Sequence, residues 1–125
     1  MAIMDLQAFS RRVAQFFTTY DVLLNPTLAQ PPVPLGQIVS TWDDPWRAAR
    51  AAHDFVAYAA VVANVTGAPA MSVPLHWTAD GLPVGVHVLG RPGEDALLLR
   101  LAGQLERARP WADRWPALVT DGVPS

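Results

Sequence analysis

Side chains that could carry out covalent chemistry are few in this sequence of 125 residues. Its four serines stand at positions 10, 40, 72 and 125, and none lies in a Gly-x-Ser-x-Gly or Ser-x-x-Lys pattern. Ser72, in the run Pro-Ala-Met-Ser-Val-Pro, is therefore expected to be a structural residue of a strand. All nine basic residues are arginines, so the chain offers no neutral lysine as a proton acceptor.

The histidines and carboxylates form no motif for metal binding or acid–base catalysis. His53, His76 and His87 lack the spacing of a zinc motif, and His87 is expected to be a hydrogen-bonded polar residue on a strand. The carboxylate pairs Asp43-Asp44 and Glu94-Asp95 stand at predicted helix starts, where capping accounts for them. The sequence therefore predicts no catalytic residue, no metal site and no cofactor.

Composition excludes several classes of partner. Hydrophobic residues make up 51% of the chain, charged residues 16%, and the net charge is −2, which predicts a globular protein that binds neither nucleic acid nor an anionic membrane surface. No cysteine is present, which excludes disulfides and fits a cytoplasmic location. No stretch reaches the roughly 18 apolar residues of a membrane span, and no signal peptide is expected.

The first elements expected to position a site are a helix and a strand. Residues 4–19 have apolar side chains at helical spacing. Val22-Leu23-Leu24 is a continuous apolar run, which predicts a strand buried on both faces. Because Pro26 has no amide hydrogen, we expect the strand ladder to stop there. The proline-rich segment 29–42 then predicts an ordered, extended loop rather than a ligand for an SH3-type domain.

A helix follows this loop, with Asp44 as its cap, Pro45 in its first turn and an alanine-rich body to Ala63. Strands over residues 70–75 and 82–89 flank an Asp-Gly turn. A last helix begins near Glu94 and has leucines at helical spacing. Residues 110–125 are expected to form an irregular tail whose tryptophans pack back onto the body. The order predicts an α/β fold, part of a mixed β-sheet flanked by helices.

Two stretches resemble the C-terminal part of an amidase signature family hydrolase. The run YDVLLNPTLAQPP resembles the family's buried strand and the proline-rich turn after it. The run from Asn64 to Trp111 resembles the family's closing block. The matching residues are Asn64, Gly67, Pro69, Ala70, Ser72, Pro74, Gly81-Leu82-Pro83, Gly85, Gly90 and Leu97-Leu98. The resemblance extends from about Phe9 to Pro116.

Members of this family resemble one another in hydrolysing carboxylic amides with a serine nucleophile, a second serine in a cis peptide and a lysine as the ultimate base. Those groups belong to the N-terminal and central regions of a chain several times longer, and no position here matches them. The resemblance implies that residues 1–125 form a single partial domain, whose outer strands and helices back one wall of a substrate pocket. It also implies a C-terminal fragment or subunit of an amidase that is inactive alone.

One departure bears on the type of amidase. In the glutaminase subunits of tRNA amidotransferases, an acidic residue is expected about seven positions before the equivalent of Asn64. Ala57 stands there in this sequence. The resemblance therefore favours a general amidase, such as one acting on linear or cyclic oligoamides.

The expected partners follow from this interpretation. Strands taken from a large sheet present unpaired backbone groups and apolar faces, so we expect binding to the missing N-terminal amidase portion, or self-association. A small-molecule amide would bind only in the complete enzyme. Three residues are expected near its pocket: Thr27 at a strand end, Phe55 on an inward helix face and Asn64 at a helix exit. The alternatives are a non-catalytic structural or binding module derived from the same fold, and an independent enzyme with an unrecognised site.

Overall fold

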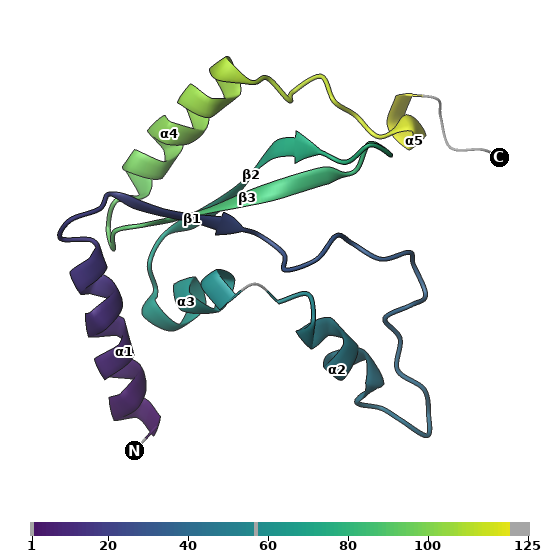
Figure 1. The fold of residues 1–125 in the computed structure, drawn as a ribbon, viewed down its shortest axis with the longest axis horizontal. Coiled ribbons are helices and arrows are strands. Elements are labelled where there is room, and N and C mark those ends of the chain that lie inside the picture. Colours follow the sequence, from purple (N-terminus) through teal and green to yellow (C-terminus); the bar gives the residue numbers. More distant parts are fainter. Residues whose placement is uncertain (1, 57, 121–125) are drawn as a thin grey trace.

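The computed structural model describes residues 2–56 and 58–120 (Figure 1). Its strands are β1 (Val22–Pro26), β2 (Ala70–Trp77) and β3 (Pro83–Gly90). Its helices are α1 (Ala2–Phe16), α2 (Arg47–His53), α3 (Tyr58–Thr66), α4 (Asp95–Ala108) and α5 (Ala117–Thr120). The predicted α/β class, with helices flanking a sheet, is confirmed. None of the described helices is long and apolar enough to span a membrane.

The strands form one sheet in the order β1-β3-β2, and both pairings are antiparallel. In the register, Val88 of β3 lies between Leu24 of β1 and Met71 of β2. The predicted hairpin joins β2 to β3. Gly81 has a φ of +86° in its turn, a conformation that glycine adopts without a steric penalty.

Helices cover both faces of this sheet (Figure 1). On one face, α4 packs through the buried Leu98 against Gly90, where an added Cβ would lie 3.2 Å from the leucine side chain. On the other face, α1 and α3 enclose a small apolar cluster with the sheet. Its residues are Phe17, Ala68 and Leu89, with Val13, Phe16, Leu23, Val62 and Ala63 packed against them.

β1 differs from its prediction in two ways. Leu24 is 59% exposed, so the strand is not buried on both faces within the part of the chain that the structure describes. The ladder also continues past Pro26, because the Thr27 amide donates to the Gly85 carbonyl over 3.0 Å. Alternation along the strand then points the Pro26 nitrogen away from β3 and toward the open edge, where proline removes no ladder bond.

β2 has the same arrangement on the opposite side of the sheet. The Gly90 amide donates to the Pro69 carbonyl over 2.8 Å, so alternation points the Pro74 nitrogen to the open edge of β2. The register shifts between Pro74 and His76, which is the irregularity of a β-bulge. Both outer strands of the described sheet therefore have an open edge that contains a proline.

The single helix predicted after the proline-rich loop is two helices, α2 and α3. Between them, the Ala29 amide donates to the Phe55 carbonyl over 3.1 Å, and Val56 forms an isolated antiparallel bridge with Leu28. These residues therefore pair with the chain that leaves β1 instead of continuing the helix. Phe55 thus lies in a break and not on the inward helix face predicted for it.

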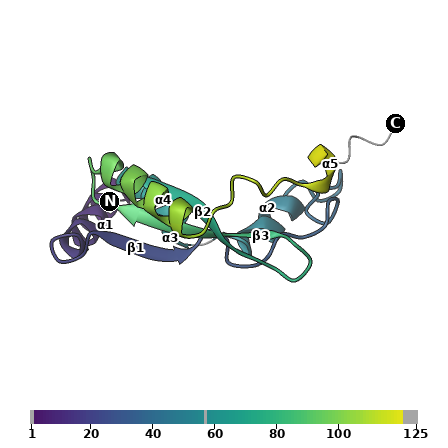
Figure 2. The same cartoon turned by 90° about the horizontal axis from the view of Figure 1, so that it is seen from above.

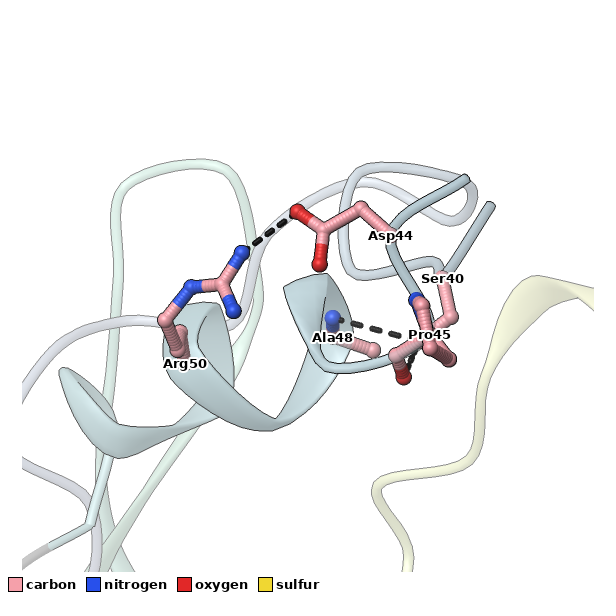
Figure 3. Close-up of polar contacts among 5 residues, drawn as sticks. All are labelled: Ser40, Asp44, Pro45, Ala48 and Arg50. Carbon is pink, nitrogen blue, oxygen red and sulfur yellow. Dashed lines mark hydrogen bonds and ion pairs between the residues drawn. The ribbon is translucent and has the colours of Figure 1, made fainter. Parts of the chain in front are cut away.

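The start of α2 is also different from the prediction (Figure 3). Asp44 does not cap the helix; its carboxylate forms an ion pair with Arg50. The cap comes from the preceding loop, where the Ser40 hydroxyl accepts a hydrogen bond from the Ala48 amide over 3.3 Å. That hydroxyl also donates to the Pro45 carbonyl over 2.8 Å, so one serine bridges the loop and the first turn.

The start of α4 is close to its prediction. Glu94 is the N-cap residue and Asp95 lies in the first turn, where a negative charge favours the helix dipole. Glu94 does not make the expected capping bond, since its side chain forms no hydrogen bond at the N-cap.

The tail after α4 returns to the end of β2 through Arg114, whereas Trp115, one of the two tryptophans predicted to pack onto the body, is 65% exposed. The Arg114 guanidinium lies 4.1 Å from the centre of the Trp77 ring at the end of β2, a cation–π contact. The tail ends in the short helix α5, which lies at the same end of the molecule as α2 in both views (Figures 1 and 2). Residues 121–125 of the predicted irregular tail lie outside the described residues.

Candidate functional site

An open hollow of about 410 Å³ lies where β1 ends and the proline-rich loop begins. Its walls come from this stretch and from β2 and β3. The lining residues are Pro26, Thr27, Leu28, Ala29, Gln30, Pro31, Pro32, Ser72, Pro74, Pro83, Val84 and Gly85. None of these side chains carries a charge, and most are apolar, as is usual for small-molecule sites.

Two hydroxyl groups meet across the central strand at this hollow. The Thr27 and Ser72 oxygens are 2.6 Å apart, and either group can be the donor. Thr27 directly follows β1 and Ser72 belongs to β2, so their side chains reach each other over β3. They cross at Gly85, where an added Cβ would lie 2.6 Å from each oxygen. The hydroxyl pair can therefore form only because glycine at position 85 has no side chain.

A second polar pair lies on the same face of the sheet. His87 is 6% exposed, and its Nδ1 is 3.0 Å from Oδ1 of Asn25, its register partner. Asn25 donates from Nδ2 to the Pro26 carbonyl over 3.0 Å, which turns Oδ1 toward the ring. Nδ1 is then the donor, in the neutral imidazole as in the protonated one. Burial lowers the pKa of His87, which favours the neutral form.

The two pairs form one polar row, because the ladder continues from Asn25 to Thr27 just past β1 and Ser72 is the register partner of His87. Within this row no nucleophile is hydrogen-bonded to a base: the Ser72 hydroxyl pairs with Thr27, and the hydrogen bond of the His87 ring goes to Asn25. Among residues 2–56 and 58–120, no group of three or more potential metal ligands is present. What the arrangement can do is bind and orient a neutral polar group at the base of an apolar hollow.

The three predicted substrate-binding residues lie in different places. Thr27 lines the hollow and is half-buried. Phe55 does not line it, but its carbonyl holds Ala29, which is part of the wall. Asn64 is exposed on α3 and is not among the lining residues. The role of all three in binding substrate stays a prediction.

Sequence reasoning missed the partnership of Thr27 with Ser72. The available signal was Gly85, because a glycine inside a strand often marks a close approach of other groups. That signal does not name the groups that approach, and the two hydroxyls are 45 residues apart in the sequence.

Three comparisons with known proteins agree that the chain is similar to amidases. The amidase family profile matches residues 1–99. AmiC of Mycobacterium tuberculosis, a protein named as an amidase, is 46% identical over 112 residues, which are 90% of this chain and 23% of the relative. An acylamidase of Rhodococcus erythropolis is 40% identical over 102 residues, 82% of this chain and 21% of the relative. The structure of 6-aminohexanoate cyclic dimer hydrolase superposes with a TM-score of 0.78 and 31% identity, over 91% of this chain and 25% of that one. The chain thus spans about a quarter of the length of the relatives it matches.

Proposed function

Because the chain belongs to the amidase family, we propose that it supplies the C-terminal sheet segment of an enzyme that hydrolyses carboxylic amide bonds. The rest of that enzyme contributes the serine nucleophile and the lysine base. The proposal rests on the family match, together with the finding that this chain covers less than a quarter of the length of its relatives. In this proposal, residues 1–125 are one partial domain that does not turn over amides by itself.

The open surfaces of the chain support the proposal that another polypeptide binds to it. β1 and β2 each pair on one side only within the described residues. Leu24 on β1 is exposed, and Leu35 and Trp42 in the proline-rich loop are fully exposed. Unpaired strand edges and exposed apolar side chains of this size favour association with another polypeptide. We take that polypeptide to be the remaining amidase portion, with a second copy of the chain as its competitor.

The hollow beside Thr27 is the part of the substrate pocket that this chain contributes in our proposal. Phe55 acts through its backbone by holding the loop wall, and Asn64 faces the pocket from the exposed side of α3 once the remaining portion is bound. The similarity to 6-aminohexanoate cyclic dimer hydrolase supports a linear or cyclic oligoamide as substrate. Ala57, which argues against an amidotransferase, lies outside the described residues.

The test is complementation. The chain is expressed alone and together with the preceding portion of AmiC, and hydrolysis of a simple aryl amide is measured. We expect no turnover above background for the chain alone and clear turnover for the mixture. Turnover by the isolated chain that Ser72→Ala abolishes and Ser10→Ala leaves unchanged would overturn the proposal, because Ser10 bonds only to its own helix, at the Leu6 carbonyl.

Light scattering separates this function from the alternative of a non-catalytic module. A chain that lacks its partner is expected to self-associate through its open strand edges, so its apparent molar mass should rise with protein concentration. A monomer at every concentration, with a cooperative melt and no binding to the amidase portion, favours the module. A cytoplasmic location is also part of the proposal and rests on the absence of cysteine; cell fractionation tests it.

A further inference from the structure

A second hollow, which we call the tail recess, lies between the β2–β3 hairpin and the tail that follows α4 (Figure 1). Its volume is about 800 Å³, within the roughly 300–1,000 Å³ of small-molecule sites. We propose that the tail recess binds a small organic cation of the quaternary ammonium class, which takes the place of the Arg114 guanidinium on the ring of Trp77. This inference does not depend on amide hydrolysis by the assembled enzyme, because the binding belongs to residues of this chain.

The tail recess is rich in tryptophan. Trp77 at the end of β2 and Trp111 and Trp115 in the tail line it, so it gathers three of the five tryptophans of the chain. The face of an indole ring carries partial negative charge and attracts cations more strongly than the other aromatic rings do. A quaternary ammonium group suits such faces, because it has no N–H groups whose hydrogen bonds to water would be lost on binding.

The structure already holds one cation in this recess. The Arg114 guanidinium lies 4.1 Å from the centre of the Trp77 ring, within the distance of about 6 Å over which a cation–π contact acts. Among residues 2–56 and 58–120, no carboxylate forms an ion pair with Arg114. The residue is exposed, and cation–π contacts at exposed positions are weak. A ligand can therefore displace the guanidinium, which then returns to water.

A carboxylate gives the recess a preference for the sign of the ligand's charge. Asp113 lines the recess and lies in a tail turn, where the Arg114 amide donates to the Trp111 carbonyl over 3.0 Å. Within the part of the chain that the structure describes, the Asp113 carboxylate forms no hydrogen bond or ion pair. It is therefore available to attract a cation bound in the recess, and it repels an anion.

Three probes of nearly equal shape test the proposal: choline, its neutral isostere 3,3-dimethylbutan-1-ol, and the anion 3,3-dimethylbutanoate. Each is titrated into the ¹⁵N-labelled chain at neutral pH and low salt, where charge effects are least screened. The indole N–H signals of Trp77, Trp111 and Trp115 are followed by NMR. Trp42 is the internal control, because it is fully exposed and does not line the recess.

We expect choline to shift the three recess signals in a saturable way and to leave the Trp42 signal in place. Its affinity should exceed that of the alcohol at least about fivefold, a difference of about 1 kcal/mol. Equal binding of choline and the alcohol, tighter binding of the anion, or no response of the three signals would overturn the proposal. Vesicles of phosphatidylcholine carry the same group on a lipid. We expect them to leave the signals unchanged, and a response to vesicles without one to free choline would also overturn it.

Two further measurements test the roles of Arg114 and Asp113. The Nε–H signal of Arg114 should move to the position of a solvated arginine as choline saturates, since the guanidinium leaves the Trp77 ring; an unmoved signal contradicts the displacement. Asp113→Asn should weaken choline binding about threefold, the size expected for an exposed charge. The matched control is Glu106→Gln, which removes the same charge at an exposed position of α4 outside the recess. An equal effect of the two variants contradicts the role of Asp113.

Discussion

Gly85→Ala is the substitution that tests most directly how the hollow is built. The added Cβ would lie 2.6 Å from the Thr27 oxygen, 2.6 Å from the Ser72 oxygen and 3.0 Å from the Thr27 Cβ. Atoms do not approach this closely, so the two hydroxyls must move apart and their hydrogen bond is lost. The backbone itself tolerates alanine, because Gly85 does not have a positive φ.

The free energy of unfolding should fall by a calculable amount. Loss of the hydrogen bond costs about 0.5–1.5 kcal/mol, and forcing a methyl group into occupied space costs about 1–3 kcal/mol. Replacing glycine by alanine returns roughly 0.4–1 kcal/mol by restricting the unfolded chain. We therefore expect Gly85→Ala to destabilise the protein by about 1–3 kcal/mol.

Urea unfolding followed by tryptophan fluorescence measures this change, since Trp77 ends the strand that carries Ser72. The control is Gly103→Ala in α4, where the added Cβ meets only the Arg107 guanidinium at an ordinary 3.5 Å. That variant should gain about 0.5–1 kcal/mol from helix propensity. The explanation depends mainly on the hydroxyls, so Gly85→Ala should cost less in a Thr27→Ala/Ser72→Ala background, where only the 3.0 Å contact with the Cβ of residue 27 remains. An undiminished cost there would refute it.

Three other predictions concern the core, the polar row and the cap. Leu98→Ala should cost about 2–5 kcal/mol in urea unfolding, because the side chain is buried; the exposed Leu99→Ala should stay within about 0.5 kcal/mol, and equal losses would contradict the packing of α4. Burial lowers the pKa of His87, so the unfolded chain takes up a proton first as the pH falls. The stability from this residue is complete above about pH 6.5 and decreases below it. The urea midpoint should therefore drop more between pH 7 and 5 for the parent than for His87→Gln, and parallel curves would exclude His87 as the cause. Ser40→Ala should cost about 0.5–2 kcal/mol and lower the hydrogen-exchange protection of the Ala48 amide; unchanged protection would mean that the hydroxyl does not cap α2.

Several elements could be predicted because their signals are local. The Asp80-Gly81 turn and the strands beside it form the hairpin that glycine and alternation indicated. The leucine spacing and the acidic first turn were sufficient to predict α4. In each case the residues that decide the structure are neighbours in the sequence, so no knowledge of distant partners was needed.

The elements that could not be predicted depend on distant partners. An alanine-rich run favours one long helix, but the chain leaves the helix where Phe55 and Val56 pair with Ala29 and Leu28. The Pro26 nitrogen was expected to end a ladder, but its effect depends on which side of the strand carries the neighbour. The hydroxyl pair at the candidate site is the same kind of case, because Thr27 and Ser72 meet only after three strands have assembled around Gly85.

The prolines at the two open edges have a consequence for how the chain behaves at high concentration. Fibrils grow when identical strands stack through uninterrupted rows of amide and carbonyl groups. A molecule approaching β1 or β2 finds such a row broken at Pro26 or Pro74, and β2 is further distorted by its bulge. Uncontrolled stacking is therefore opposed on both flanks, while a polypeptide shaped to pass these interruptions can still attach.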